Sequence, residues 1–371
     1  RGESEAFTCA YAGNLRELAA LIRLLANTGS AKTTDLLEEL DVLLKDDKEL
    51  YDNISEKQQV LARFTSLCCH HVSGSRKAFS LLSLAENLEH KAQWLSEYIR
   101  KQEWIQAGQG EGWFNSYYDN HGQAVEGIRE DRVRMMLTGQ VFAIMGKVAE
   151  DPQIRSIIKS ADHYLYKKEI GGYRLNTDFH ELKFDLGRMF GFAYGEKENG
   201  AVFSHMAVMY GNALYRRGYA KEGWKVLKSL SDTALDFNTS RIYPGIPEYF
   251  RSDGRGMYHY LTGAASWYML TMVTQVFGVR GEGGDLIIAP KLLAEQFDSQ
   301  GKASIRISFA NKTLEVIFEN ADRKDYGDYT LASAVCEGRE LPIAEGSYGI
   351  LSRKVLDGLG DGIHSVTIQL I

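Results

Sequence analysis

The sequence predicts a mainly α-helical protein that ends in a small antiparallel β-domain. Residues 1–277 repeat apolar side chains at intervals of three and four, which is the period of amphipathic helices. After Gly278 the pattern changes to strict alternation, as in Ile305–Asn320, which is typical of strands. We therefore expect helices in antiparallel pairs over residues 1–277 and a β-sandwich over residues 278–371.

The helical region divides at short connections rich in Asn, Ser and Gly. The expected helices are Ala6–Ala26, Thr34–Leu50, Glu56–Cys69, Ser75–Arg100, Val133–Ala149, Pro152–Tyr166, Val202–Arg217, Ala220–Ala234 and Ala264–Phe277. Between them, Gly112–Gly127 alternates aromatic and polar residues around Asp119–Gly122, which predicts a hairpin. Two long loops, YRLNTDFHELKFD and RIYPGIPEYFRSDGRGMYHYLTG, carry many aromatic and charged residues and are therefore candidates for a functional site.

The C-terminal region reads as a series of strands. Ile305–Asn320 predicts two strands about a turn at Asn311–Lys312, and DYTLASAVCEG and HSVTIQLI predict further strands. The glycine-rich stretch Gly278–Gly284 follows a helix and precedes a strand, whereas a nucleotide-binding loop needs the reverse order. We interpret this stretch as a connection between domains.

Composition and charge exclude some classes of binding partner and indicate where the protein is expected in the cell. The chain has 371 residues and a formal net charge of −6, without a run of basic residues, which argues against nucleic acid as the main partner. No apolar stretch approaches the ~20 residues of a membrane span. Four cysteines in a chain of this length do not form a disulfide framework, so a reducing, cytoplasmic location is expected. The chain opens with Arg1 rather than Met, so we expect it to be part of a longer protein.

Thr262 and Gly263 form the first candidate site. Thr262 is a good N-cap, and Gly263 allows a ligand to approach the backbone closely. The N-terminus of a helix at this point would offer unpaired N–H groups to an anion. An ordinary capped helix explains the same residues, and the preceding aromatic residues Tyr258, His259 and Tyr260 favour a lined pocket.

His205, Glu198 and Asn199 form the second candidate site. His205 interrupts an apolar helix, where it is either a hydrogen-bonded core residue or a protonated donor to phosphate. Glu198 and Asn199 either decorate the entry to that helix or bind sugar hydroxyls. Cys68–His71 is unsuited to a metal, because four consecutive helical residues point in different directions.

Carboxylates are frequent in the long loops and in the hairpin region. A glycoside hydrolase needs two of them on either side of the scissile bond. The spacing does not single out such a pair among Glu111, Asp119, Asp178, Asp185, Glu248 and Asp253.

Several of these stretches together resemble glycoside hydrolase family 94, the inverting phosphorylases that act on β-linked glucosides. GWFNSYYDNHG, YRLNTDF, YGEKENGAVFSH and YLTGAASW occur in the family's order, and GVRGEGGDLIIAP is similar to its exit into the C-terminal β-domain. The resemblance implies an (α/α)6 barrel, of which this chain holds the C-terminal portion. It also implies that phosphate attacks the anomeric carbon while one Asp protonates the leaving oxygen.

The resemblance assigns roles to individual residues. His205, Thr262 and Gly263 correspond to the phosphate site, and Glu198 corresponds to the residue that binds the donor sugar. The family's general acid lies in an Asp-Trp-Asn-Asp type motif upstream of the Gly-Glu-Ser stretch matched here by Gly2–Ser4. We therefore expect the acid, and an arginine of the phosphate site, upstream of this chain and no catalytic residue within it. No metal or organic cofactor is implied, and inorganic phosphate is a co-substrate.

The linkage is interpreted from two stretches. Ile242–Glu248 and AFTCAYAGNL are more similar to the β-1,2-oligoglucan (sophorooligosaccharide) phosphorylases than to cellobiose-type members, and Tyr243 and Glu248 become candidate substrate-binding residues. The alternatives are a phosphorylase of another β-linkage, such as cellobiose or laminaribiose, a non-catalytic carbohydrate-binding fragment, or a hydrolase on the same helical barrel. The predicted partners are an oligosaccharide, phosphate and the N-terminal portion of the same protein.

Overall fold

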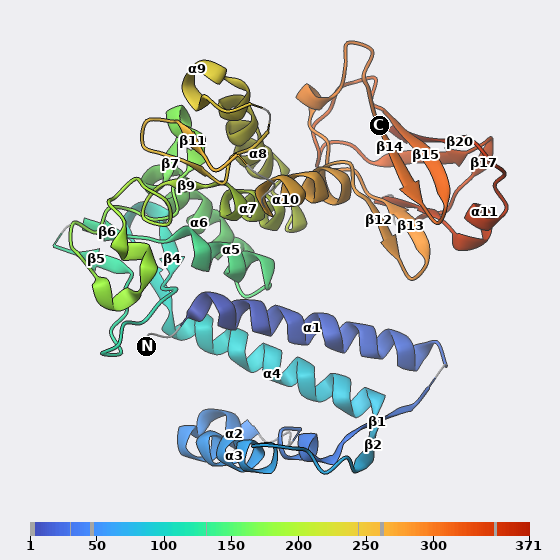
Figure 1. Ribbon diagram of the computed structural model, residues 1–371. Helices are drawn as coiled ribbons and strands as arrows, with labels where there is room; N and C mark the ends of the chain where they lie inside the picture. Colours follow the sequence, from blue (N-terminus) through green and yellow to red (C-terminus); the bar gives the residue numbers. More distant parts are fainter. Residues whose placement is uncertain are drawn as a thin grey trace. The chain divides into compact units, whose positions relative to one another are not determined.

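The computed structural model describes residues 4–29, 31–44, 48–130, 132–243, 245–259, 263–344 and 347–371 (Figure 1). The chain packs as two compact units, Arg1–Ser160 and Ala161–Ile371. The division predicted between residues 277 and 278 falls inside the second unit, where helices give way to strands, and it stays a prediction. Within the described ranges, none of the helices combines the length and the apolar character needed to cross a bilayer.

The first unit is built on two long helices, α1 (Glu5–Asn27) and α4 (Leu81–Gln102). They run antiparallel, because Ala19 and Ile22 of α1 pack against Leu81 and Ala85 of α4 in a buried cluster. Farther along, the Arg16 guanidinium donates to the carbonyl oxygen of Ala92 at 3.3 Å. The sequence periodicity correctly predicted α1 almost to the residue.

A third helix of this unit, α5 (Leu137–Met145), lies alongside α1 in the same direction. The rings of Phe7 and Phe142 lie 5.7 Å apart, and a methyl group at Gly13 would lie 2.8 Å from Cα of Gly146. Glycine at position 13 therefore permits close helix packing.

The helix predicted over Thr34–Leu50 is wrong. This segment forms β1 (Thr33–Leu37), η1 (Glu38–Val42) and the short α2 (Lys48–Asp52). β1 pairs antiparallel with β2 (Arg76–Ser80), which also occupies the first turn of the helix predicted from Ser75. A strand depends on a partner distant in sequence, so local periodicity does not reveal it.

The predicted helix at Glu56–Cys69 is confirmed as α3 (Ile54–Leu67), capped by the Asn53 side chain. Cys68–His71 follow its end, so the helical argument against a metal there was wrong. Among the residues that the structure describes, no three His, Cys, Asp or Glu side chains gather as a metal site.

The rest of the first unit consists of short elements. The predicted turn at Asp119–Gly122 is confirmed, since the Asp119 N–H donates to the Gln123 carbonyl at 3.0 Å and the Gly122 N–H to the Asp119 carbonyl at 3.1 Å. Two-stranded ribbons flank this turn. The elements are β3 (Trp104–Gln106), η2 (Gly108–Gly110), β4 (Gly112–Phe114), β5 (Gly127–Arg129) and β6 (Arg132–Arg134). The helix α6 (Asp151–Tyr164) ends in the second unit. The helix predicted from Val133 begins later because β6 precedes it.

Glu126 anchors this irregular region. Its carboxylate is buried and accepts hydrogen bonds from the Ser116 N–H at 3.0 Å, from the Ser116 hydroxyl and from the Met136 N–H at 2.9 Å. Burial raises the pKa of Glu126 to about 8, although these three donors favour the charged form. The side chain thereby links the hairpin segment to the start of α5.

We expect Glu126→Gln to lower the free energy of unfolding by about 1–3 kcal/mol, because its amide group would face the Met136 N–H donor. The folded protein also holds a proton on Glu126 that the unfolded chain releases near its ordinary pKa of 4.5. The contribution of Glu126 is therefore greatest in acid and declines as pH rises toward 8. Urea unfolding across this pH range should show that decline in the wild type and not in Glu126→Gln. The exposed Glu130→Gln on the same hairpin is the control, and equal pH slopes in all three proteins would refute this role.

The second unit contains a layer of helices. α7 (Ser204–Arg216) and α8 (Ala220–Leu235) run antiparallel, and a methyl group at Gly211 would lie 3.3 Å from the Gly223 carbonyl oxygen. α10 (Gly263–Thr271) runs parallel to α7 and continues into the wider turn η6 (Met272–Val276). The Asn212 side chain donates to the Thr271 hydroxyl at 3.1 Å between these two helices.

Short elements occupy the long segments before α7 and between α8 and α10. They are β7 (Tyr166–Lys167), η3 (Lys168–Ile170), β8 (Gly172–Tyr173), η4 (Phe184–Leu186), η5 (Arg188–Gly191), β9 (Val202–Phe203), α9 (Phe237–Ser240), β10 (Tyr249–Phe250) and β11 (Gly256–Met257). The helix predicted from Val202 begins at Ser204, because the two preceding residues form β9.

The C-terminal strands form two sheets. The first has the order β12-β13-β19-β18 and the second β14-β15-β20-β16-β17 (Figure 1). Their elements are β12 (Val279–Glu282), β13 (Asp285–Ile288), η7 (Ala294–Gln296), β14 (Lys302–Phe309), β15 (Lys312–Glu319), β16 (Leu331–Cys336), β17 (Arg339–Glu340), β18 (Ile343–Ala344), β19 (Tyr348–Leu351), α11 (Arg353–Asp357) and β20 (Ile363–Leu370).

Three details of the predicted β-domain are corrected. The domain is not purely antiparallel, because β15 and β20 pair in parallel from Thr313 and Ile363 onward. The turn between β14 and β15 lies at Ala310–Asn311, both with positive φ, one residue earlier than predicted. The stretch Gly278–Gly284, predicted as a connection, instead forms β12 and the hairpin turn before β13.

Candidate functional site

A three-stranded sheet of order β11-β10-β9 positions the candidate site in the second unit. Tyr249 of β10 pairs with Phe203 of β9, and their rings stack at 4.8 Å between centroids. The Ser204 N–H donates to the Glu248 carbonyl oxygen at 2.9 Å at the point where α7 begins. Because His205 follows directly, the sheet holds Glu248 and Tyr249 beside the first turn of α7.

His205 lies between two helix starts. Its ring centroid is 6.0 Å from those of Phe203 and Trp267. A methyl group at Gly263 would lie 2.6 Å from the His205 ring, so the first residue of α10 touches the imidazole. The structure thus brings His205 and Gly263 together from segments that are far apart in the sequence.

The electrostatic environment of His205 favours a neutral ring. Burial lowers the pKa of His205, and the negative charge of Glu248 partly offsets that effect. The protonated donor expected from the sequence is therefore not the resting form near neutral pH; an anion bound against the ring would favour protonation. His205 Nε2 is buried and has no hydrogen-bond partner among the described residues. An unsatisfied polar atom of this kind often marks a place that a ligand or ion completes.

Glu198 is the second side chain with an unsatisfied oxygen. Its Oε1 pairs with the Arg188 guanidinium at 3.1 Å, while its Oε2 is buried without a hydrogen-bond partner in the part of the chain described. Glu198 also acts on Tyr249, whose pKa is raised by burial, by the negative charges of Glu198 and Glu248 and by a hydrogen bond to the Glu198 carboxylate. Tyr249 therefore connects the surroundings of Glu198 with those of His205.

Asn199 has a structural role. Its side-chain amide donates to the Phe192 carbonyl at 2.8 Å and accepts from the Asn176 amide at 3.1 Å. Asn176 in turn accepts from the Gly200 N–H at 2.8 Å. The N–H2 group and the carbonyl oxygen of the Asn199 side chain thus both form hydrogen bonds within the protein. Of the two predicted residues, Glu198 is therefore the better candidate to bind a sugar hydroxyl.

Gly200 is required by this loop. Its φ is +76°, and a methyl group there would lie 2.1 Å from the Tyr194 ring. Glycine at position 200, just before α7, thereby allows the loop that carries Glu198 to fold.

The remaining predicted residues are placed differently. Thr262 lies outside the described residues, although α10 begins at Gly263, the position after it. Glu248 lies next to Tyr249 and influences His205, whereas the Tyr243 side chain is 83% exposed. The structure therefore groups Glu198, His205, Glu248 and Gly263, and the roles assigned to all six residues remain predictions.

Sequence reasoning missed three residues of this group: Arg188, Tyr249 and Trp267. Tyr249 directly follows the predicted Glu248, and strand alternation in the loop would have drawn attention to it. Trp267 lies one helical turn after Gly263, on the face that an α-helix shares at i and i+4. For Arg188, which lies in the irregular segment before Glu198 and is mostly exposed, the sequence held no signal.

The comparisons with known proteins identify a family and several relatives. The family model described as "Glycosyl hydrolase 94 superfamily, catalytic domain" matches residues 77–278, a range that contains every grouped residue. The cellobionic acid phosphorylase of Neurospora crassa is 28% identical over 183 residues, which are 45% of this chain and 23% of that protein. The solabiose phosphorylase of Paenibacillus borealis is 23% identical over 282 residues, 73% of this chain and 34% of that protein.

A more distant match covers less of the sequence. The cyclic beta-(1,2)-glucan synthase NdvB of Rhizobium meliloti is 28% identical over 123 residues, which are 30% of this chain and 4% of that protein. The chain thus spans about a third or less of the length of these curated relatives.

Proposed function

The chain belongs to the glycosyl hydrolase 94 superfamily, and from that premise we propose that it is part of an inverting glycoside phosphorylase. The reaction is the reversible phosphorolysis of β-1,2-linked gluco-oligosaccharides to α-glucose 1-phosphate. The relatives named above as phosphorylases, of cellobionic acid and of solabiose, support the reaction type.

One observation carries the proposal: two buried polar atoms in the group have no hydrogen-bond partner among the described residues. They are Nε2 of His205 and Oε2 of Glu198. An imidazole N–H is suited to a phosphate oxygen, and a carboxylate oxygen to a sugar hydroxyl. A site that must hold phosphate against a glucosyl ring requires both kinds of group at neighbouring positions.

The phosphate site of this proposal consists of His205, the Gly263 N–H and the Thr262 hydroxyl. The contact of Gly263 with the His205 ring supports the pairing of the first two. The N-terminus of α10 adds backbone N–H groups and a partial positive charge. Phosphate held there replaces the base-activated water of an inverting hydrolase, so one general acid suffices. That Asp is proposed to lie upstream of this chain.

The proposed architecture is part of an (α/α)6 barrel. In the first unit α4 runs antiparallel to α1 while α5 runs parallel to it. In the second unit α8 runs antiparallel to α7 while α10 runs parallel to it. This alternation within each unit supports helical hairpins whose inner helices share one direction.

The β-1,2 linkage rests on the loop at Ile242–Glu248 and on the relative whose name includes a beta-(1,2)-glucan. Tyr243 and Glu248 are the proposed contacts to the saccharide in that loop. Phosphorolysis of another β-linkage is the second candidate, favoured by the relatives named for cellobionic acid and solabiose.

The proposal is tested by incubating the full-length protein with phosphate and, in parallel, sophorotriose, cellotriose or laminaritriose. We expect glucose 1-phosphate to appear with sophorotriose and to depend on added phosphate. Glucose 1-phosphate from another saccharide would support phosphorolysis but show that the enzyme acts on a different linkage. Free glucose without glucose 1-phosphate would indicate a hydrolase, and no product with any saccharide would indicate a binding fragment.

A further inference from the structure

We propose that the second unit carries a second saccharide-binding site, in an open cavity along α8 and separate from the group around His205. The cavity has a volume of about 990 Å3, at the upper end of the ~300–1,000 Å3 typical of ligand pockets. None of Glu198, His205, Glu248 and Gly263 lines it. The inference goes beyond the proposed function, which supplies only the choice of saccharide.

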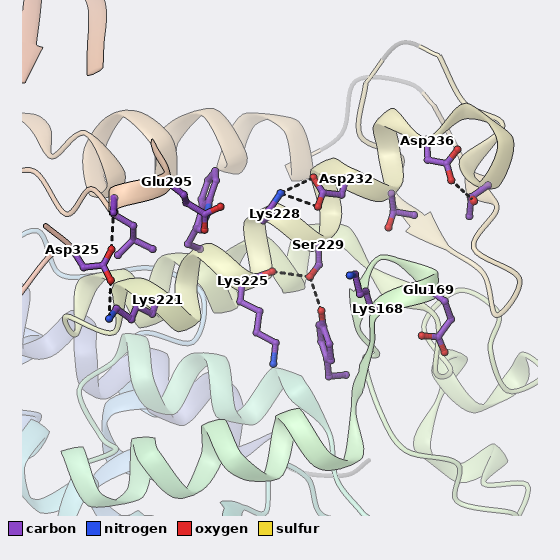
Figure 2. A pocket seen from close by; sticks show the side chains of 16 residues that line it. Lys168, Glu169, Lys221, Lys225, Lys228, Ser229, Asp232, Asp236, Glu295 and Asp325 are labelled. Atoms are coloured by element: carbon purple, nitrogen blue, oxygen red, sulfur yellow. Dashed lines mark hydrogen bonds and ion pairs between the residues drawn. The ribbon is translucent and has the colours of Figure 1, made fainter. Parts of the chain in front are cut away.

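The side chains along α8 form the floor of the cavity (Figure 2), and each of the three lysines among them forms an ion pair with a carboxylate. Lys221 pairs with Asp325 at 2.8 Å, and Lys228 pairs with Asp232 at 3.1 Å. Lys225 lies 4.1 Å above the Tyr166 ring. These contacts fix a polar floor of three lysines and one aspartate along α8, with the Tyr166 ring beside it.

Three charged side chains that line the cavity are available to a ligand. Lys168, Glu169 and Glu295 line the cavity, are exposed, and form no ion pair or hydrogen bond of their side chains with the described residues. Lys168 and Glu169 belong to η3, whereas Glu295 belongs to η7, and Figure 2 shows Glu295 near Lys228, apart from Lys168 and Glu169. A ligand that reaches both places must be elongated.

Trp224 adds a fourth unsatisfied group. Its indole Nε1 is buried and has no hydrogen-bond partner among the described residues, although Trp224 itself lines the cavity. By contrast, the indole of Trp94 in the first unit donates to Asp52 at 2.9 Å. Because this nitrogen has no access to solvent, a ligand hydroxyl can accept from it only after the indole turns toward the cavity.

The balance of charge identifies the class of ligand. Four lysines and five carboxylates line the cavity, so the wall is close to neutral and slightly acidic, which disfavours an anion. A neutral molecule with many hydroxyl groups can accept from Lys168 and Trp224 and donate to Glu169 and Glu295. These requirements are met by a linear neutral oligosaccharide, and we assign the cavity to a β-gluco-oligosaccharide.

Titration calorimetry with linear β-1,2-gluco-oligosaccharides tests the assignment. The measurement uses full-length protein with Glu198→Ala, so that saccharide binding reports on the second cavity. We expect saturable binding, weakened about tenfold or more by Lys168→Ala with Glu295→Ala, because two hydrogen bonds to the ligand are lost at unchanged net charge. Trp224→Phe should weaken it by about three- to tenfold.

Two matched controls accompany these variants. Lys354→Ala with Glu340→Ala removes an equivalent exposed pair that does not line the cavity, and Trp94→Phe removes an indole that already has an acceptor. Both controls should bind as tightly as the parent. The site is refuted if the Glu198→Ala protein binds no saccharide, or if the Lys168 and Glu295 pair can be replaced without effect. Because binding is measured without phosphate, failure of phosphorolysis would leave this result interpretable.

Discussion

Replacement of His205 by alanine is expected to lower kcat/KM for phosphate about a hundredfold to a thousandfold in the full-length protein. The imidazole touches Gly263 at the start of α10, and its Nε2 has no protein partner among the described residues. Removing one preorganised donor to a reacting oxyanion typically has an effect of this size. His205→Gln keeps an N–H donor and should retain more activity than His205→Ala. Initial rates of glucose 1-phosphate formation at varied phosphate measure both.

The same prediction has a pH signature. Burial lowers the pKa of His205, so the ring is neutral in the free protein near neutral pH. Bound sulfate, whose own charge is constant in this range, favours the imidazolium and should therefore bind more tightly as pH falls toward that pKa. His205→Gln should remove this trend. A sulfate affinity that is independent of pH in the wild type would contradict the contact between the imidazole and the anion.

Two further variants separate a local effect from a general one. Gly263→Ala should impair phosphate use while His205 is present, because the added methyl group would lie 2.6 Å from the ring. His364→Gln, in the β-sheets of the second unit, replaces another largely buried histidine and should leave phosphorolysis unchanged. Equal losses in His205→Ala and His364→Gln would indicate general destabilisation.

Replacement of Glu198 by glutamine is expected to lower kcat/KM for the saccharide about a hundredfold or more. The carboxylate is held by Arg188 through one oxygen, and its other oxygen is buried and unpaired within the described structure. Glutamine can present an N–H2 group where a sugar hydroxyl needs an acceptor, which leaves buried donors facing each other. The loss should therefore appear with the saccharide and equally with glucose 1-phosphate in the reverse direction.

Glu196 provides the matched control for this prediction. It lies in the same loop and pairs with Arg251 at 2.9 Å, away from the unpaired oxygen of Glu198. Because this half-buried pair lies outside the proposed site and glutamine keeps an oxygen that can accept from Arg251, Glu196→Gln should keep activity within about threefold of the wild type. Comparable losses in the two variants would mean that the loop fold, and not the Glu198 carboxylate, is responsible.

Many of the helices could be predicted from the sequence, because the apolar residues of an amphipathic helix recur at a regular spacing within the helix itself. The helices around Ala6–Ala26, Glu56–Cys69 and Ala220–Ala234 were predicted within a few residues. The segment Thr34–Leu50 was not, because β1 is defined by pairing with β2, and several helices lie between the two strands in the sequence. The parallel pairing of β15 with β20 has the same cause, since alternation shows that a strand exists and not which neighbour it takes.

The candidate site, like the fold, could be predicted only in part from the sequence. His205 and Gly263 were named from the motifs that resemble the family, and their contact depends on α7 and α10 packing side by side. The neutral state of His205 could not be predicted, since it follows from burial that only the fold determines. Arg188 was missed because its contact with Glu198 links two loop positions without regular spacing.

The most direct measurement is a crystal structure of the full-length protein with phosphate, or sulfate, and a β-1,2-linked glucosyl ligand. The account predicts the anion within hydrogen-bonding distance of Nε2 of His205 and of the Gly263 N–H, with Glu198 on the hydroxyls of the adjacent sugar ring. An anion bound elsewhere, with Nε2 of His205 and Oε2 of Glu198 each paired to other protein groups, would contradict it.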